Sequence, residues 1–179
     1  IFVDTVYGDY RIFDGWYIVI ATMLFAVQIY CDFAGYSTIA KGAAEILGID
    51  LVENFDAPYL STSVADFWRR WHISLTSWFK DYLYIPLGGS RKGKFRKYIN
   101  KMIVFLVSGL WHGANLSFVI WGGLNGLYQV IGEILKPVRD LGVRILHIKR
   151  DSIGHVVARG IVTFILVDIS WIFFRANGF

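Results

Sequence analysis

A polar cluster inside a long apolar stretch is the feature that most restricts how this chain can fold. The stretch runs from Met102 to Leu135, and residues 108–115, SGLWHGAN, interrupt it. One straight helix of this length would measure about 50 Å, whereas the hydrocarbon core of a bilayer is roughly 30 Å thick. The glycines and polar side chains of the cluster therefore predict a break between two helical segments.

Basic residues flank both ends of this stretch. Ser90–Lys101 contains six Lys or Arg and no acidic residue, and a second basic segment, predicted to be a loop, follows at 136–150. Basic loops mark the cytoplasmic side of a membrane protein. Two such loops on one side predict that 102–135 is a broken hairpin or re-entrant element. Irregular backbone at membrane depth is tolerated only where it is buried or lines a cavity, so we expect a cavity at His112.

The composition fits a membrane protein better than an ordinary soluble domain. Of the 179 residues, 55% are hydrophobic, 17% are aromatic and only 18% are charged. Two further apolar runs predict membrane spans at about 15–36 and 156–174. We expect an all-α, multispanning helical bundle over residues 1–179, and we interpret the chain as part of a larger protein. The flanks of Ser90–Lys101 argue against nucleic-acid binding, and its basic residues are expected to face anionic lipid headgroups.

A different helical pattern lies between these runs. Residues 63–66, SVAD, have the capping-box pattern that opens a helix, and residues 63–85 then place apolar and aromatic side chains at helical spacing. Basic and polar side chains fall on the opposite side. The sequence thus predicts one amphipathic helix lying in the membrane interface, with His72 within its apolar sector.

Two histidines are the candidates for chemistry. His72 and His112 each sit in an apolar setting beside a Trp, although a lone buried His is more often a core residue than a catalyst. Glycines around His112 would let a substrate or another backbone approach closely. Asn115 supplies a donor and an acceptor nearby. A neutral imidazole is a natural general base near pH 7, which favours proton abstraction from a nucleophile that attacks an activated acyl group.

Other polar residues in apolar segments remain open. Asp32 is either a helix-end residue at the headgroups or a carboxylate that faces the bundle, and Asp168 has a packing or a catalytic role. No His or Cys pair has the spacing of a zinc site, so we expect no metal. The single Cys31 excludes an intrachain disulfide and is interpreted as a small buried apolar residue.

Several motifs, in order, resemble the membrane-bound O-acyltransferases. The segments are QIYCDFAGYSTIAKGAAEILG, SVADFWRRWHISLTSWFKDYLYIPLGGSRKGK, SGLWHGANLSFVIWGGLNGL and the terminal WIFFRA. They are most similar to the bacterial alginate O-acetyltransferase branch, with its D-alanyl-teichoic-acid transfer relatives.

The resemblance implies a fold, an activity and partners. It implies a ring of helices round a central tunnel in the bacterial cell (inner) membrane. Its active-site histidine in the WHG motif matches His112, and a second histidine in the RWH motif matches His72. Asn115, Asp32 and Trp111 are candidate supporting residues. An acyl group would move from a cytoplasmic thioester toward an extracytoplasmic polysaccharide, with acetyl-CoA as the expected donor substrate, no bound cofactor, and a separate extracytoplasmic acetyltransferase as partner.

Three alternatives remain. Within the family, the donor is instead a carrier-protein thioester that supplies D-alanyl groups to teichoic acid. Outside it, the chain is a transporter or channel in which histidines gate protons, although few ionisable residues lie in the apolar runs. A docking subunit without chemistry is the third alternative, and it would tolerate substitution of His112.

Overall fold

Helices make up nearly all of the regular structure of this chain. The structure is a computed structural model that describes residues 2–176, so Ile1 and 177–179, the ends of the predicted 1–179 domain, lie outside the described residues. No β-strand occurs in the described part, which confirms the all-α prediction. The helices are α1 (Phe2–Gly8), α2 (Gly15–Ile46), α3 (Val64–Arg70), α4 (Ile73–Phe79), α5 (Gly93–His112), α6 (Leu116–Ile134), α7 (Lys136–Ile145) and α8 (Ile153–Arg175).

Two helices, α2 with 32 residues and α8 with 23, are long and apolar enough to cross a membrane. A third crossing results if α6 and α7, which meet at a bend of 49°, count as one broken span. α2 runs ten residues past the predicted span end at 36, because the sequence up to Ile46 keeps good helix formers. Cys31 is exposed on α2 in this chain, so its interpretation as a buried residue is wrong here.

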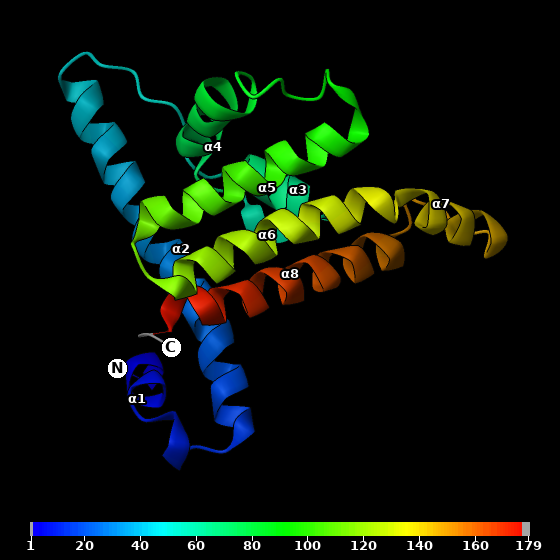
Figure 1. Ribbon diagram of the computed structural model, residues 1–179. Helices are drawn as coiled ribbons and strands as arrows, with labels where there is room; N and C mark the ends of the chain where they lie inside the picture. Colours follow the sequence, from blue (N-terminus) through cyan, green and yellow to red (C-terminus); the bar gives the residue numbers. More distant parts are fainter. Residues whose placement is uncertain (1, 177–179) are drawn as a thin grey trace.

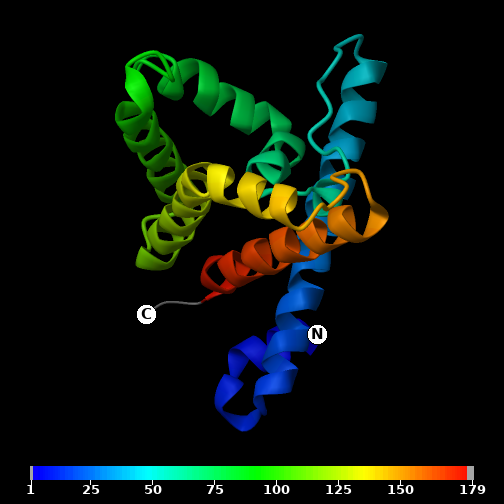
Figure 2. The same ribbon diagram turned by 90° about the vertical axis from the view of Figure 1, so that its right-hand side faces the viewer.

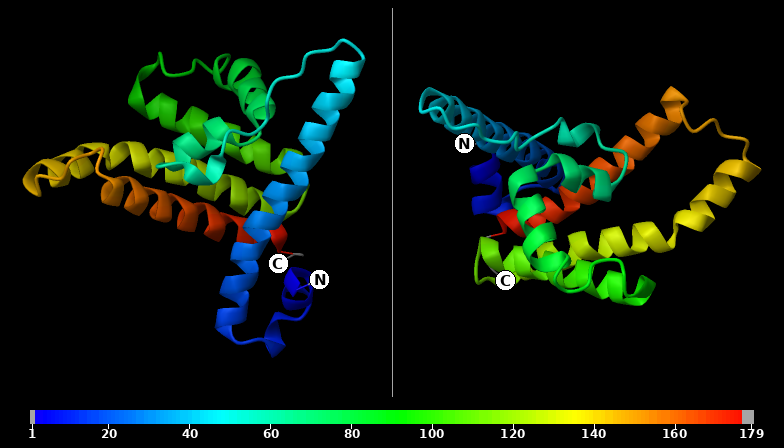
Figure 3. Two further views of the ribbon diagram at one scale, coloured as in Figure 1. Left: turned by 180° about the vertical axis from the view of Figure 1, so that it is seen from behind. Right: turned by 90° about the horizontal axis from the view of Figure 1, so that it is seen from above.

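Three helices form a layer that a fourth crosses. α5 and α6 lie side by side and run in opposite directions, and α8 packs along the other side of α6 (Figure 1). α2 crosses this layer and extends beyond it at both ends, with α1 packed beside its first turns (Figure 2). α7 projects away from the end of α6 (Figure 3). The predicted loop after 136 is thus partly helical, because Pro137 at the first turn does not oppose a helix.

Glycines bring α5 and α6 into backbone contact. A Cβ atom built on Gly109 would lie 2.3 Å from the carbonyl oxygen of Phe118, and one on Gly122 would lie 2.2 Å from that of Phe105. No side chain fits at such distances, so the two helices approach closely only because both positions are glycine. This contact fixes where the end of α5 stands relative to α6.

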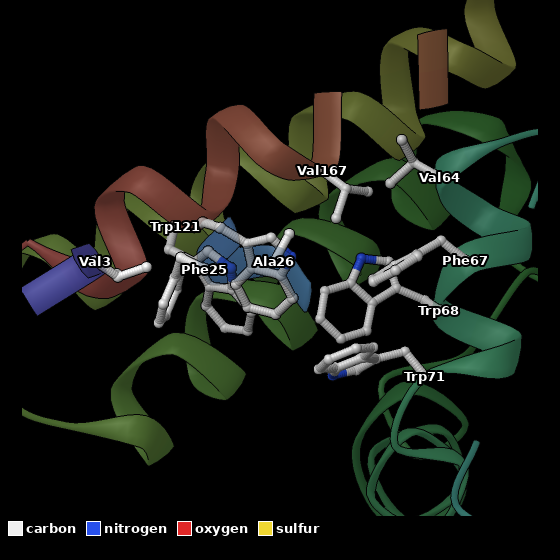
Figure 4. Packing of buried hydrophobic residues seen from close by; sticks show 10 residues of the cluster. Val3, Phe25, Ala26, Val64, Phe67, Trp68, Trp71, Trp121 and Val167 are labelled. Carbon is white, nitrogen blue, oxygen red and sulfur yellow. The ribbon is translucent and has the colours of Figure 1, made fainter. Parts of the chain in front are cut away.

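A cluster of tryptophans forms the core between the layer and α3. Trp121 and Trp171 are each 1% exposed, and their rings stack with centroids 6.0 Å apart. Trp68 of α3 and Trp71, which directly follows α3, pack against this pair (Figure 4). The Trp68 Nε1–H donates to Asn125 Oδ1 at 3.1 Å, which satisfies both groups in the buried interior.

The predicted amphipathic helix over 63–85 is divided. The Ser63 side chain accepts from the Asp66 N–H at 3.1 Å and starts α3, as the capping box suggested. Helical hydrogen bonding then stops at Trp71 and restarts in α4, and a π-helical turn, Lys80–Tyr84, follows. The cause is hydrogen bonding between residues 54–56 and the chain on either side of His72, which the periodicity of the sequence does not reveal.

Candidate active site

His112 is the last residue of α5, directly before the break that separates α5 from α6. Its imidazole lies edge-on to Trp121, with ring centroids 5.1 Å apart, and to Phe174 of α8 at 5.2 Å. These rings come from three different helices. The imidazole is therefore held in an aromatic setting where the ends of α5, α6 and α8 meet.

The break itself is built from Gly113 and Asn115. A Cβ on Gly113 would lie 2.7 Å from the ring of Phe118, so this aromatic side chain occupies the space that the glycine leaves. Asn115 begins α6 and its Oδ1 accepts from the Ser117 N–H at 3.1 Å. The side-chain carbonyl of Asn115 thus serves as a helix cap.

His72 occupies the break between α3 and α4 with a left-handed backbone, φ 46° and ψ 55°. The linker at 54–56 holds the chain in this shape. The Asp56 N–H donates to the Arg70 carbonyl and the Ile73 N–H donates to the Asn54 carbonyl, both at 3.0 Å. The two bonds straddle His72 and replace the helical bonds that are lost there.

The side chain of His72 is held from two sides. Its ring lies edge-on to Phe33 of α2, with centroids 4.7 Å apart, and Ser74 Oγ lies 3.5 Å from its Nδ1. Burial lowers the pKa of the His72 imidazole to about 4, because a charged ring would lose solvation there. His72 lies outside the candidate spans and is neutral at pH 7, so it can accept a proton or a hydrogen bond.

Both histidines line one cavity of about 400 Å³. Most of its wall is apolar, with Trp68, Trp121 and Phe174 among the lining residues. Basic side chains also line it, and they come from α3, the π-helical turn and α5: Arg69, Lys80, Lys97 and Lys101. Lys97 and Lys101 both pair with Glu133 of α6. The arrangement is an apolar chamber with two imidazoles and a cationic rim.

The other candidate residues lie elsewhere. Asp32 and Asn115 line a second cavity of about 860 Å³, together with Gln28 of α2. Asp32 stands well inside α2 and not at an end of this helix. Trp111 is 58% exposed and touches His112 edge-on at 4.9 Å without lining either cavity, and Asp168 lines neither.

Sequence reasoning missed residues that shape the chamber. Trp121 and Phe174 contact His112, but as aromatic residues in apolar runs they gave no signal of their own. The buried Trp121 Nε1–H has no hydrogen-bond acceptor among the residues that the structure describes. Asn125, fully buried in α6, could have been noticed as an amide inside a membrane segment. Within residues 2–176, no three His, Cys, Asp or Glu residues gather to hold a metal ion.

The sequence matches one protein family over most of its length. The model of the MBOAT, membrane-bound O-acyltransferase, family covers residues 7–173. This range includes both histidines, every helix from α2 to α7, and all the residues that line the shared cavity except Phe174.

Curated proteins with related sequences have names that describe the transfer of an acyl group. The chain is 41% identical over 164 residues to "Probable alginate O-acetylase AlgI" of Pseudomonas aeruginosa, which covers 92% of this chain and 29% of that protein. It is 38% identical over 156 residues to "Peptidoglycan O-acetyltransferase" of Helicobacter pylori, covering 87% and 28%. To "Teichoic acid D-alanyltransferase" of Bacillus subtilis it is 36% identical over 105 residues, covering 55% and 27%.

The chain therefore spans a little under a third of the length of these relatives. The family match, the apolar helices and the sequence identity agree on one class of protein. This chain is an integral membrane protein and belongs to the membrane-bound O-acyltransferase family.

Proposed function

We propose that the protein transfers an acyl group, in the first instance acetyl, from a cytoplasmic thioester donor to a hydroxyl of an extracytoplasmic polysaccharide. One observation carries the proposal: two imidazoles share one apolar cavity in a chain whose relatives are named as O-acetylating proteins. We place the protein in the bacterial inner membrane, where a separate extracytoplasmic acetyltransferase would complete delivery to the polysaccharide.

The cavity supplies the parts that such a reaction needs. An apolar wall accommodates the acyl group and the pantetheine arm of acetyl-CoA, and Lys97 and Lys101 on the rim attract its phosphates. His112 accepts the proton of the acceptor hydroxyl as its oxygen attacks the thioester carbonyl. The carbon–sulfur bond then breaks, and the CoA thiolate takes up a proton.

Two further groups support this step. Trp121 lines the same cavity and contacts His112 edge-on, so its ring holds the imidazole in place. His72 orients the thioester or the acceptor. Its place in the cavity is fixed by the contacts with Phe33 and the 54–56 linker.

D-alanyl transfer from a carrier-protein thioester is the second candidate. The named D-alanyltransferase of Bacillus subtilis aligns with 55% of this chain, whereas the alginate O-acetylase aligns with 92%. The longer match favours acetyl transfer. An assay that offers labelled acetyl-CoA and a labelled D-alanyl carrier protein together separates the two donors, because only the true donor transfers its label.

The test of the proposal uses the full-length protein in proteoliposomes with labelled acetyl-CoA. We expect His112→Ala to lower acetyl transfer by a factor of roughly 100 to 10,000, the usual contribution of a general base. His155→Ala is the matched control, since His155 of α8 lines neither cavity. Normal transfer by a folded His112→Ala protein would refute the role of His112, and no transfer by the unaltered protein from either donor would refute the proposed function.

A further inference from the structure

The two cavities of this chain meet at three shared residues. Ile29 and Phe33, one turn apart on α2, and Phe174 near the end of α8 line both the cavity of the histidines and the second cavity. All three are half-buried and apolar. α2 and α8 pack against each other, so their side chains stand between the two spaces.

Each phenyl ring of this set also contacts one of the candidate histidines. The ring centroids of Phe33 and His72 lie 4.7 Å apart, and those of Phe174 and His112 lie 5.2 Å apart. Both contacts are edge-on. The boundary between the cavities is thus in direct contact with both imidazoles. A change in either ring would alter the space beside an imidazole.

The two cavities differ in chemistry. The first holds the imidazoles, an apolar wall and a cationic rim. The second also has apolar side chains in its wall, but its polar groups include a carboxylate, two amides and a guanidinium, from Asp32, Gln28, Asn115 and Arg175, which are groups that hydrogen-bond hydroxyls. Apolar and cationic surroundings suit an acyl thioester that carries phosphates. Amide and carboxylate groups suit a hydroxyl-rich acceptor.

We infer that Ile29, Phe33 and Phe174 form an apolar partition between a thioester chamber, the first cavity, and an acceptor chamber, the second cavity. This inference rests on the proposed function. The partition keeps water of the acceptor chamber away from the thioester until an acceptor hydroxyl displaces the rings. Without it, water would attack the thioester carbonyl: a carbon–oxygen bond forms, the carbon–sulfur bond breaks, the CoA thiol takes a proton and acetate leaves. Excluding water from a reactive group is a general use of closed sites.

The first test measures two products in one sample. Phe33→Ala and Phe174→Ala, in the full-length protein in proteoliposomes, should raise the ratio of free acetate to transferred acetyl several-fold. Phe164→Ala is the matched control: Phe164 is also half-buried on α8 and packs on Tyr59 with centroids 5.4 Å apart, but it lines neither cavity. A ratio that stays unchanged in both partition variants would overturn the inference. If the alanine variants do not fold, Phe33→Leu and Phe174→Leu carry the same test with less loss of packing.

The second test needs no turnover, so it separates failure of the partition from failure of the proposed function. Ser108, 7% exposed, lines the thioester chamber only, and Ser108→Cys places a thiol there in a protein whose other cysteines, including the exposed Cys31, are replaced by Ala. A membrane-impermeant thiol reagent added on the side opposite the basic loops should label this thiol much faster when Phe174→Ala is also present. Equal labelling with Phe174 intact and replaced would overturn the partition, even for an active acyltransferase.

Discussion

At the scale of single residues, His72 has a left-handed backbone conformation, which is unusual for a residue with a large side chain. A left-handed conformation costs an L-residue about 1–2 kcal/mol, and Asn and Gly bear it best. Among the described residues, only Ala57, His72 and His147 combine a side chain with a positive φ, and His72 alone of these lines the chamber. The bonds from the 54–56 linker offset the strain, which indicates that the position of the imidazole matters more than local stability.

Substitutions at His72 should separate its backbone role from its chemical role. We expect His72→Asn to keep the thermal stability of the protein in detergent nearly unchanged, because Asn tolerates the left-handed region. His72→Val should destabilise it by about 2 kcal/mol, since a β-branched side chain is poorly accommodated there. Thermal unfolding, followed by circular dichroism, measures both.

Activity of the same pair completes this prediction. Because His72→Asn lacks the imidazole, it should lower acetyl transfer while the protein stays folded. A fully active His72→Asn protein would show that the imidazole is not required, and equal stability of the Asn and Val variants would contradict the strain argument.

At the scale of helices, two breaks place the histidines, and only one of them could be predicted. The break after His112 follows from residues 108–115 themselves, where glycines and an Asn cap interrupt an apolar run. The break at His72 depends on hydrogen bonds from the 54–56 linker, which lies well before it in the sequence. Periodicity read 63–85 as one helix because its aromatic spacing continues through Trp71, whereas tertiary contacts decided the outcome.

The same contrast holds for the site. His72 and His112 could be selected as rare polar residues in apolar settings, and the structure places them on one cavity. Asn115 and Asp32 are also polar residues in apolar segments, yet they line the second cavity. The sequence alone does not say on which side of Phe174 such a side chain lies. Phe33 could not be identified at all, because one phenylalanine among many has no pattern that marks it.

The close contact of α5 and α6 gives a prediction about elements. Gly109→Ala and Gly122→Ala should each destabilise the protein by about 1–3 kcal/mol, because the added methyl group meets a backbone carbonyl of the neighbouring helix. Gly132→Ala, also on α6, should be neutral or stabilising by up to about 1 kcal/mol, since nothing lies within 4 Å of the position.

Thermal unfolding of the three variants in detergent checks this prediction. Because His112 follows Gly109 by less than one turn, the two destabilising variants should also lose acetyl transfer. Gly109→Ala and Gly132→Ala proteins of equal stability would mean that α5 and α6 can separate without cost.

At the scale of the whole molecule, the hairpin of α5 and α6 gives the chain a direction. Glu133 near the end of α6 pairs with Lys97 and Lys101 in the first half of α5, so both basic segments stand at one end of the hairpin. The break between α5 and α6 stands at the other end (Figure 1). The cationic rim of the thioester chamber lies near the basic end, where a soluble donor would arrive.

This direction predicts which side of the membrane each segment faces. With Cys31 replaced by Ala, single cysteines at Lys94→Cys and Arg144→Cys should be protected from a membrane-impermeant thiol reagent in intact cells. Both should react in inverted membrane vesicles, because basic segments that flank spans stay on the cytoplasmic side. Both side chains are exposed in this chain, so lack of reaction in cells would report topology instead of burial. Reaction of only one of the two cysteines in intact cells would place the two basic segments on opposite sides of the membrane. That result would contradict the predicted topology of the hairpin.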